Sequence, residues 1–566
     1  MRNSRLCFAL GLAALLAFPG GLIAAWQADQ HRLLADAYDS GQIDREQYYL
    51  YQLQSIYEPE KLPVEFALDV TQPMKCGTPI VTEIMRQWDT FSEEFRMTAS
   101  AMAIRPNTEF QYISPDGFFK LHYDTRSGME TPPVLLDDLN ANSIPDFIED
   151  MASYADSSWR QLTVNFGYQQ PPSDGTLGGD SLYDLYFDQF QYYGVTNGDF
   201  PTDSAWDDWS SHIVLHRNFL NFPPNQDPEG SRKGSMKVAI GHELYHAVQF
   251  YYDAYMGTWW AEQTAVWMED EIFPGIHDNY NYFDHFWPEP EVSLIDGSDP
   301  MHPYGAFVWP KFLTQYVDPG VVKTVLENMA YPSSSLMAEF QAALALYGTN
   351  LGEAFKDFQY WNYMTGSRDI GMHYVDAADY PEIAIMRGHD AVPVFEQWSF
   401  AAPYNLGSNY IQVTNDSSYR QILTFSFDTA FAAPWGLAYI TADSSGEYQY
   451  LETSVSAGGE GTVYVPYFGE YQSAVFIPYV KGTAVGGPYG FSYNLYFRSF
   501  GDADGSGEVD IDDAVWIIQY IFSGGLASDP EAAMDSDCSG EIDIDDVVYL
   551  ISYIFSDGPA PCEDEP

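Results

Sequence analysis

Basic residues are scarce in this sequence. Its 566 residues include 24 Lys plus Arg against 81 Asp plus Glu, which gives a formal net charge of -57. Binding to nucleic acid needs a basic surface that neutralises phosphates, so the composition argues against a nucleic-acid partner. An acidic surface suits an exported protein that binds divalent cations, and it equally suits a protein that stays soluble in a salty habitat.

Long apolar runs are also rare, and one lies at the N-terminus. Arg2 and Arg5 precede an apolar run over residues 6–18, and small residues follow up to Ala25. This order is typical of a secretory signal peptide spanning residues 1–25. A membrane anchor fits less well, because the run is shorter than the ~20 residues that cross a bilayer. We therefore expect a secreted protein, extracellular or associated with the cell surface, with no transmembrane anchor after signal cleavage.

Cysteine is scarce as well. Cys7 leaves with the signal peptide, so three cysteines remain, which are Cys76, Cys538 and Cys562. Three is an odd number in an oxidising compartment, and at most one intramolecular disulfide can form. One thiol therefore needs another explanation.

The composition changes along the chain and predicts several domains. Residues 26–95 contain helix-like apolar spacing interrupted by turn residues, which predicts a helical N-terminal segment or pro-region. Residues 96–395 mix strand-like and helix-like stretches, as in an α+β domain. Residues 396–499 contain six or more short alternating runs, which favour an antiparallel β-sandwich. Residues 500–566 carry an internal repeat that predicts a small all-α calcium module.

Two copies of one loop-helix unit make up this repeat, "DADGSGEVDIDDAVWIIQYIF" from Asp502 and "DSDCSGEIDIDDVVYLISYIF" from Asp535. Oxygen donors fall at loop positions 1, 3, 5, 9 and 12, with a backbone carbonyl at position 7 and glycine at position 6. A calcium ion needs six to eight oxygen ligands, and such a loop can supply them. The predicted ligands are Asp502, Asp504, Ser506, Glu508, Asp510 and Asp513 in the first copy, and Asp535, Asp537, Ser539, Glu541, Asp543 and Asp546 in the second.

The paired loops, each followed by one amphipathic helix, resemble a type I dockerin over residues 500–562. Serine at loop position 5 departs from the best-known dockerins. The resemblance implies attachment to a cohesin-bearing scaffold or cell-surface protein, and it links the chain to assemblies that degrade polysaccharides. We also expect a disulfide between Cys538 and Cys562 that fastens the second loop to the chain end and leaves Cys76 unpaired.

A third loop of the same pattern lies upstream, in "DLNANSIPDFIE". Serine replaces glycine at position 6, and the acid at position 12 is retained. We predict a calcium site here, with a turn that caps the following helix as the alternative. The predicted ligands are Asp138, Asn140, Asn142, Ile144, Asp146 and Glu149.

The stretch "GHELYH" predicts a metal site. His242 and His246 are four residues apart, so on a helix both imidazoles project from one face and can bind one zinc ion. Zinc lowers the pKa of a bound water to about 7, and the neighbouring Glu243 can take its proton. The alternative is a helix whose histidines only pack or cap.

The third protein ligand is Glu262 or Glu269, which lie on one face of the next helix. The stretch "WWAEQTAVWME" resembles the glutamate-bearing helix of the gluzincin metallopeptidases, which implies a zincin-like fold with Glu262 as ligand and Glu269 orienting a histidine. The segment before it is shorter than in the gluzincin aminopeptidases. Over residues 60–320 the chain is similar to secreted bacterial HExxH metalloproteases. In gluzincins a tyrosine or histidine stabilises the oxyanion, and Tyr304 is the candidate here, with His302 as its competitor.

The stretch "QPMKCGTPI" resembles the cysteine-switch sequence of the matrixins. This resemblance implies that Cys76 binds the zinc until the pro-segment is released. An intermolecular disulfide and a buried free thiol are the alternatives.

The combined prediction is a secreted zinc-dependent peptidase that acts on protein or peptide substrates and is attached through a calcium-dependent module. One alternative is an inactive extracellular binding or assembly protein that uses the sandwich and the dockerin-like module. Another is a carbohydrate-active component of such an assembly, which would need a pair of catalytic carboxylates in the sandwich.

Overall fold

The computed structural model describes residues 31–67, 74–125, 133–202, 206–297, 299–331, 335–414, 421–484 and 486–562. The expected signal peptide lies outside these residues. The chain forms two compact units. The first contains the chain up to Thr258 together with Met268–Asp284 and Asp299–Met301, and the second contains the remainder. None of the described helices is both long and apolar enough to cross a membrane.

A six-stranded mixed sheet organises the first unit, in the order β1-β5-β6-β4-β3-β2. Strands β1 and β5 are parallel, β5 and β6 are antiparallel, and β6, β4 and β3 are mutually parallel before the antiparallel β2. The strands are β1 (Met74–Cys76), β2 (Phe110–Ile113), β3 (Phe119–Tyr123), β4 (Tyr183–Asp188), β5 (Tyr192–Pro201) and β6 (Trp209–His216).

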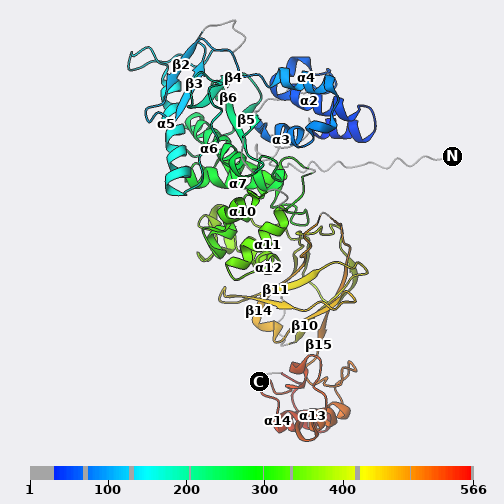
Figure 1. Cartoon of the computed structure of the whole chain (residues 1–566). Coiled ribbons are helices and arrows are strands. Elements are labelled where there is room, and N and C mark those ends of the chain that lie inside the picture. Colours follow the sequence, from blue (N-terminus) through cyan, green and yellow to red (C-terminus); the bar gives the residue numbers. More distant parts are fainter. Residues whose placement is uncertain are drawn as a thin grey trace, which may run out of the picture. The chain divides into compact units, whose positions relative to one another are not determined.

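The helices of the first unit are shown together with this sheet in Figure 1. Helix α6 packs against β5 and β6, and α5 packs against α6 and β3. Because α6 is buried on nearly every side, it carries apolar and small residues around its whole circumference. The helices are α2 (Arg45–Tyr57), α3 (Thr78–Arg86), α4 (Glu93–Met102), α5 (Asp146–Arg160), α6 (Ser231–Tyr252) and α7 (Thr258–Ile272). Within α7, Trp259–Trp267 belong to the second unit. A π-helix, Gln161–Asn165, continues α5.

The second unit begins with a helical part and continues into a β-sandwich. The helices are α8 (His302–Gly305), α9 (Val308–Phe312), α10 (Val321–Met329), α11 (Leu336–Leu346) and α12 (Leu351–Tyr363). The sandwich strands are β7 (Arg387–His389), β8 (Val394–Trp398), β9 (Ile411–Thr414), β10 (Ile422–Asp428), β11 (Trp435–Asp443), β12 (Tyr448–Thr453), β13 (Glu460–Val465), β14 (Tyr471–Val480) and β15 (Ser492–Arg498).

Two sheets make up the sandwich, with strand orders β13-β10-β15-β8 and β12-β11-β14-β9-β7. All strand pairs are antiparallel except β7 with β9. Alternate residues of both sheets point into a shared apolar core, in which the rings of Phe425 and Phe476 stack 4.3 Å apart. The strands therefore have the inward and outward alternation that the sequence predicted.

The last residues form two helices, α13 (Ile511–Ser523) and α14 (Ile544–Ser556), each preceded by a loop. The aspartates Asp510 and Asp543 cap these helices through reciprocal hydrogen bonds with Asp513 and Asp546. The two helices pack through a small apolar core that includes Ile517 and Leu550.

The coarse prediction of a multidomain α+β chain agrees with these elements. Two boundaries differ from expectation. Strand β7 starts at Arg387, ahead of the expected sandwich boundary at residue 396. Strand β1 belongs to the six-stranded sheet, although residues 26–95 were expected to form a separate N-terminal segment. Both strands contain only three residues, too few to show an alternating pattern in the sequence.

Candidate metal centre

Helix α6 places His242, Glu243 and His246 in the interior of the molecule, and each side chain is at most 1% exposed. The histidines are one helical turn apart, and their Nε2 atoms lie 3.0 Å from each other. The i, i+4 spacing therefore has the geometric result that the sequence predicted, with both imidazoles aimed at one point.

The outer ring nitrogens determine which tautomers are present. His242 Nδ1 lies 2.7 Å from Glu269 Oε1, and His246 Nδ1 lies 2.7 Å from Gln249 Oε1. Because both partners are acceptor oxygens, each Nδ1 carries the proton and each Nε2 presents a lone pair. Two lone pairs at this distance repel each other, and a cation between them turns the arrangement into an attractive one.

Two further side chains complete a buried cluster. The ligand atoms of Cys76, His242, His246 and Glu262 all lie within 4.8 Å of one another. Imidazole, thiolate and carboxylate are the ligands that zinc takes, at bond lengths of about 2.0–2.3 Å in a tetrahedron. Cys76 comes from β1 and Glu262 from α7, so the donors are far apart in the sequence. The residues fit zinc, and with four protein donors the set is closed.

Glu243 lies beside this cluster and is completely buried. Its Oε2 accepts a hydrogen bond from Thr78 Oγ1 at 3.0 Å and contacts Thr196 Oγ1 at 2.7 Å, whereas its Oε1 has no hydrogen-bond partner within the described part of the chain. Strand β5 passes so close that a Cβ atom at Gly194 would lie 2.6 Å from Glu243 Cγ. Only glycine at this position allows the glutamate to occupy its place, and the sequence pattern did not single out Gly194.

Behind His242 a buried lysine connects two carboxylates. Lys75 Nζ lies 2.8 Å from Glu269 Oε2 and 2.7 Å from Asp278 Oδ2, and its side chain is fully buried. Burial alone would lower the pKa of Lys75, but the charges of Asp278 and Glu269 outweigh it and raise the pKa above its usual value. Tyr193 donates a hydrogen bond to Asp278. Lys75 and Asp278 were not identified from the sequence, because nothing local pairs residues 203 positions apart.

Replacing Lys75 is expected to destabilise the first unit. In Lys75→Met, the carboxylates of Glu269 and Asp278 remain buried without their cation. Breaking a buried ion pair from one side destabilises a protein by about 3–5 kcal/mol. We therefore expect the thermal unfolding midpoint of the first unit to fall by roughly 10 °C, as measured by calorimetry.

The matched control is Lys61→Met. Lys61 pairs with Glu58, but its side chain is 56% exposed. An exposed pair of this kind contributes little, and the midpoint should change by no more than about a degree or two. Equal unfolding midpoints for the two variants would mean that the Lys75 pairs do not hold β1 in the sheet.

The two candidates for oxyanion stabilisation lie in the short helix α8. Tyr304 is 4% exposed, and His302 is buried with its Nδ1 at 2.7 Å from the carbonyl oxygen of His285. The role of either residue stays a prediction.

The two C-terminal loops bring their acids together. Asp502, Asp504 and Asp513 form one cluster with ligand atoms within 4.8 Å of one another, and Asp535, Asp537 and Asp546 form the equivalent cluster in the second copy. The hydroxyls of Ser506 and Ser539 turn toward the carbonyl oxygens of Glu508 and Glu541. Asp510 and Asp543 cap the following helices.

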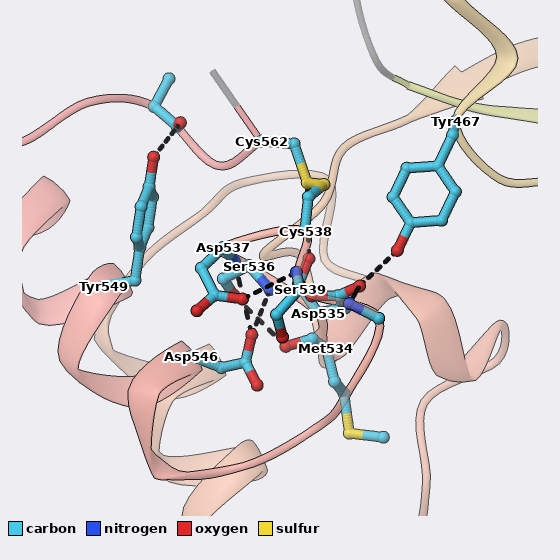
Figure 2. The surroundings of a disulfide bond; sticks show 12 residues. Tyr467, Met534, Asp535, Ser536, Asp537, Cys538, Ser539, Asp546, Tyr549 and Cys562 are labelled. Carbon is cyan, nitrogen blue, oxygen red and sulfur yellow. Dashed lines mark hydrogen bonds between the residues drawn. A yellow bond between two sulfur atoms is a disulfide. The ribbon is translucent and has the colours of Figure 1, made fainter. Parts of the chain in front are cut away.

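Figure 2 shows the second loop beside the disulfide between Cys538 and Cys562, whose Cα atoms are 5.2 Å apart. The tyrosine hydroxyl of Tyr467, from the sandwich, donates a hydrogen bond to Asp535. Burial, assisted by the charge of Asp537, raises the pKa of Asp546 to about 6. Cys76 is buried and forms no disulfide within the described part of the chain.

The upstream loop shares its backbone conformation with these two. Glu149 lies 2.8 Å from the side-chain amides of both Asn140 and Asn142, and Asp138 accepts hydrogen bonds from the backbone of Asn142 and Ser143. Positions 4 and 6 have positive φ in all three loops. These residues are Ala141 and Ser143, Gly505 and Gly507, and Cys538 and Gly540. Ser143 therefore adopts the turn for which glycine is usual, at φ 72°. Asp146 bonds to the backbone of Leu139, and Ile144 belongs to the same loop.

Comparison of the chain with models of known protein families found no match, and comparison with curated proteins also found none.

Proposed function

We propose that this chain is a secreted zinc-dependent peptidase of the gluzincin type. The observation that carries the proposal is the convergence of two imidazole Nε2 atoms, 3.0 Å apart, on a point shared with Glu262 and Cys76, with Glu243 adjacent in the chain. Structural zinc sites do not need an unpaired carboxylate oxygen beside them, whereas a hydrolytic site does.

The chemistry is divided among the side chains. Zinc held by His242, His246 and Glu262 would supply Lewis-acid chemistry, lowering the pKa of a water molecule and polarising a peptide carbonyl. Glu243 Oε1 would accept a proton from the attacking water and return it to the leaving amine. Thr78 and Thr196 hold the other oxygen, so the carboxylate stays oriented through both proton transfers. Glu269 keeps His242 in the tautomer that binds metal.

Cys76 would be the fourth ligand in a latent form of the enzyme. Its thiolate would keep the reacting water out, because zinc binds thiolate well. Residues 74–76 pair with β5, and this pairing holds the thiol among the other donors. Activation therefore requires Cys76 to leave the metal.

The C-terminal repeats attach the enzyme through calcium-bound, dockerin-like loops. Support for a protein partner, such as a cohesin-bearing scaffold or surface protein, comes from apolar side chains that remain more than a third exposed on both helices. They occupy equivalent positions in the two copies, namely Ile511, Val515, Ile518 and Phe522 on α13 and Ile544, Val548, Ile551 and Phe555 on α14. The disulfide beside the second loop suits an extracellular location.

The closed donor set favours one second candidate. Four buried protein ligands are typical of structural zinc sites, in which case the chain would be an inactive extracellular binding or assembly protein that uses the sandwich and the dockerin-like module. Hydrolysis of casein by a Cys76→Ala protein, measured with and without a zinc chelator, distinguishes the peptidase from the binding protein. Activity that disappears with chelator and returns with zinc supports the peptidase. Zinc-loaded, folded protein that cleaves no member of a broad peptide library supports the binding protein.

Calcium binding by the repeats depends on the aspartates at loop position 12. Replacing both, as Asp513→Ala with Asp546→Ala, removes a buried acid from each cluster. We expect calcium affinity, measured by titration calorimetry, to fall at least about 10-fold.

The adjacent pair Asp512→Ala with Asp545→Ala is the control, because these exposed residues lie outside both clusters found among the described residues. Calcium affinity equal in the two double variants would contradict the assigned ligands. The upstream loop is tested by stoichiometry. The unmodified chain should bind three calcium ions, and Glu149→Ala should bind two.

A further inference from the structure

The outer face of one sandwich sheet carries exposed aromatic side chains. Phe395 and Trp398 on the edge strand β8 are 59% and 65% exposed, and Phe400 just beyond this strand is 68% exposed. Large aromatic side chains are usually covered, so three exposed ones within six residues indicate a surface that meets a ligand.

The strand register places these residues on the side away from the core. Trp398 pairs with Ser492, whereas Gln397 pairs with the buried Tyr493, and paired residues point to the same face. Ser492, Asn494 and Tyr496 then share the outward face with Trp398. The ring of Phe395 stacks against that of Tyr496 at 6.3 Å and 20°. We call Phe395, Trp398 and Tyr496 the aromatic sheet face.

Polar side chains lie beside the rings, and Arg498, which follows Tyr496 on the same face of β15, is paired with Asp502. Ser426, on the next strand, lies opposite Asn494, and Asp428 lies opposite Ser492. The aromatic sheet face thus combines ring surfaces with hydroxyl, amide and carboxylate groups. Just beyond β8, the ring of Phe400 lies 5.2 Å from the guanidinium of Arg387, which comes from β7 of the other sheet.

Charge restricts the partner. Acids on this face and the net charge of -57 repel phosphate chains, acidic lipids and acidic polysaccharides. Basic partners are compatible with this charge, but aromatic rings flanked by hydroxyl and amide groups match a sugar chain. Each pyranose has an apolar C–H face that packs on an aromatic ring, and hydroxyls around its rim that bond to serine, asparagine and aspartate.

We propose that the aromatic sheet face binds a neutral polysaccharide chain. The sandwich then holds the protein on a glycan, separately from the metal centre and from the calcium loops. The proposal does not depend on the peptidase activity.

Affinity electrophoresis of the full chain through gels containing hydroxyethyl cellulose, glucomannan or xylan tests this proposal, with sedimentation on insoluble cellulose and chitin in parallel. We expect retention by at least one of these neutral polymers, competed by its soluble oligosaccharide. Trp398→Ala and Phe395→Ala should each lower the binding constant about 5- to 10-fold, because each removes one stacking platform. Calorimetry of both variants should give the wild-type unfolding midpoint, since the side chains are exposed.

Tyr331→Ala is the matched control, because Tyr331 is 64% exposed and lies outside the sandwich. The gel should retain this variant as strongly as the unmodified chain. It should also retain Glu243→Gln as strongly, because glycan binding does not depend on the peptidase activity. The proposal fails if no neutral polymer retains the chain, or if Trp398→Ala and Phe395→Ala are both retained normally. It also fails if lipid vesicles or a basic protein bind the face and oligosaccharides do not compete.

Discussion

A Cys76→Ala protein is expected to hydrolyse casein far faster than the unmodified chain. The thiol of Cys76 lies within 4.8 Å of the ligand atoms of His242, His246 and Glu262, so it closes the metal site from inside the molecule. A ligand from the same chain competes with water for the metal at an effective concentration on the order of millimolar or higher. Removing it should raise the rate on the order of 100-fold. The remaining three donors should still hold one zinc ion, as measured by atomic absorption.

Ser55→Ala is the control for this variant. Ser55 is also buried and bonds to Tyr192 of β5, close to β1, but it is not part of the metal cluster. It should leave activity as low as in the unmodified chain. If Cys76→Ala instead loses both zinc and its folded structure, the closed set of four ligands is structural. If the unmodified chain is already as active as Cys76→Ala, the thiol does not bind the metal in solution.

Glu243→Gln, introduced into the Cys76→Ala protein, is expected to remove most of the new activity. Glutamine has the same shape and can still accept hydrogen bonds from Thr78 and Thr196, but it cannot take a proton. General acid-base catalysis contributes about 10²–10⁴-fold, so kcat should fall by that factor. Zinc content should not change, because Glu243 is not one of the four clustered donors.

Glu229→Gln in the same background provides the comparison. Glu229 is a half-exposed residue paired with Lys233 and Lys237, and its replacement should leave kcat unchanged. Full activity in the Glu243→Gln protein would exclude Glu243 as the base. A parallel loss of zinc would mean that Glu243 helps to hold the metal, and the mechanism would need a different proton acceptor.

Some features of the metal centre could be predicted because they depend only on residues that are close together in the sequence. A four-residue spacing on a helix brings His242 and His246 onto one face regardless of the rest of the fold. The same holds for the predicted calcium loops, in which all the proposed donors of one site lie within a twelve-residue segment. Alternate residues of the sandwich strands face the shared apolar core, and residues 396–499, predicted to form short strands, do contain them.

Other features were ambiguous in the sequence. Glu262 and Glu269 both carry a carboxylate on the same helix, seven residues apart. Their spacing did not show which of the two is the zinc ligand, and only the resemblance to gluzincins favoured Glu262. In the structure, Glu262 lies among the clustered donors and Glu269 lies on the far side of His242, bonded to its Nδ1. The difference arises from the position of α7 relative to α6, on which local spacing has no influence.

The sequence by itself determined the local arrangements: a histidine pair with its glutamate, and three loops with the same spacing of oxygen donors. Tertiary structure decided which distant groups join them. Lys75 reaches Asp278, Thr78 reaches Glu243, and Gly194 leaves room for that glutamate because β1 pairs with β5 and α6 packs across β5. Contacts within one helical turn or loop follow from backbone periodicity, whereas contacts between strands and helices far apart in the chain depend on how the whole sheet assembles.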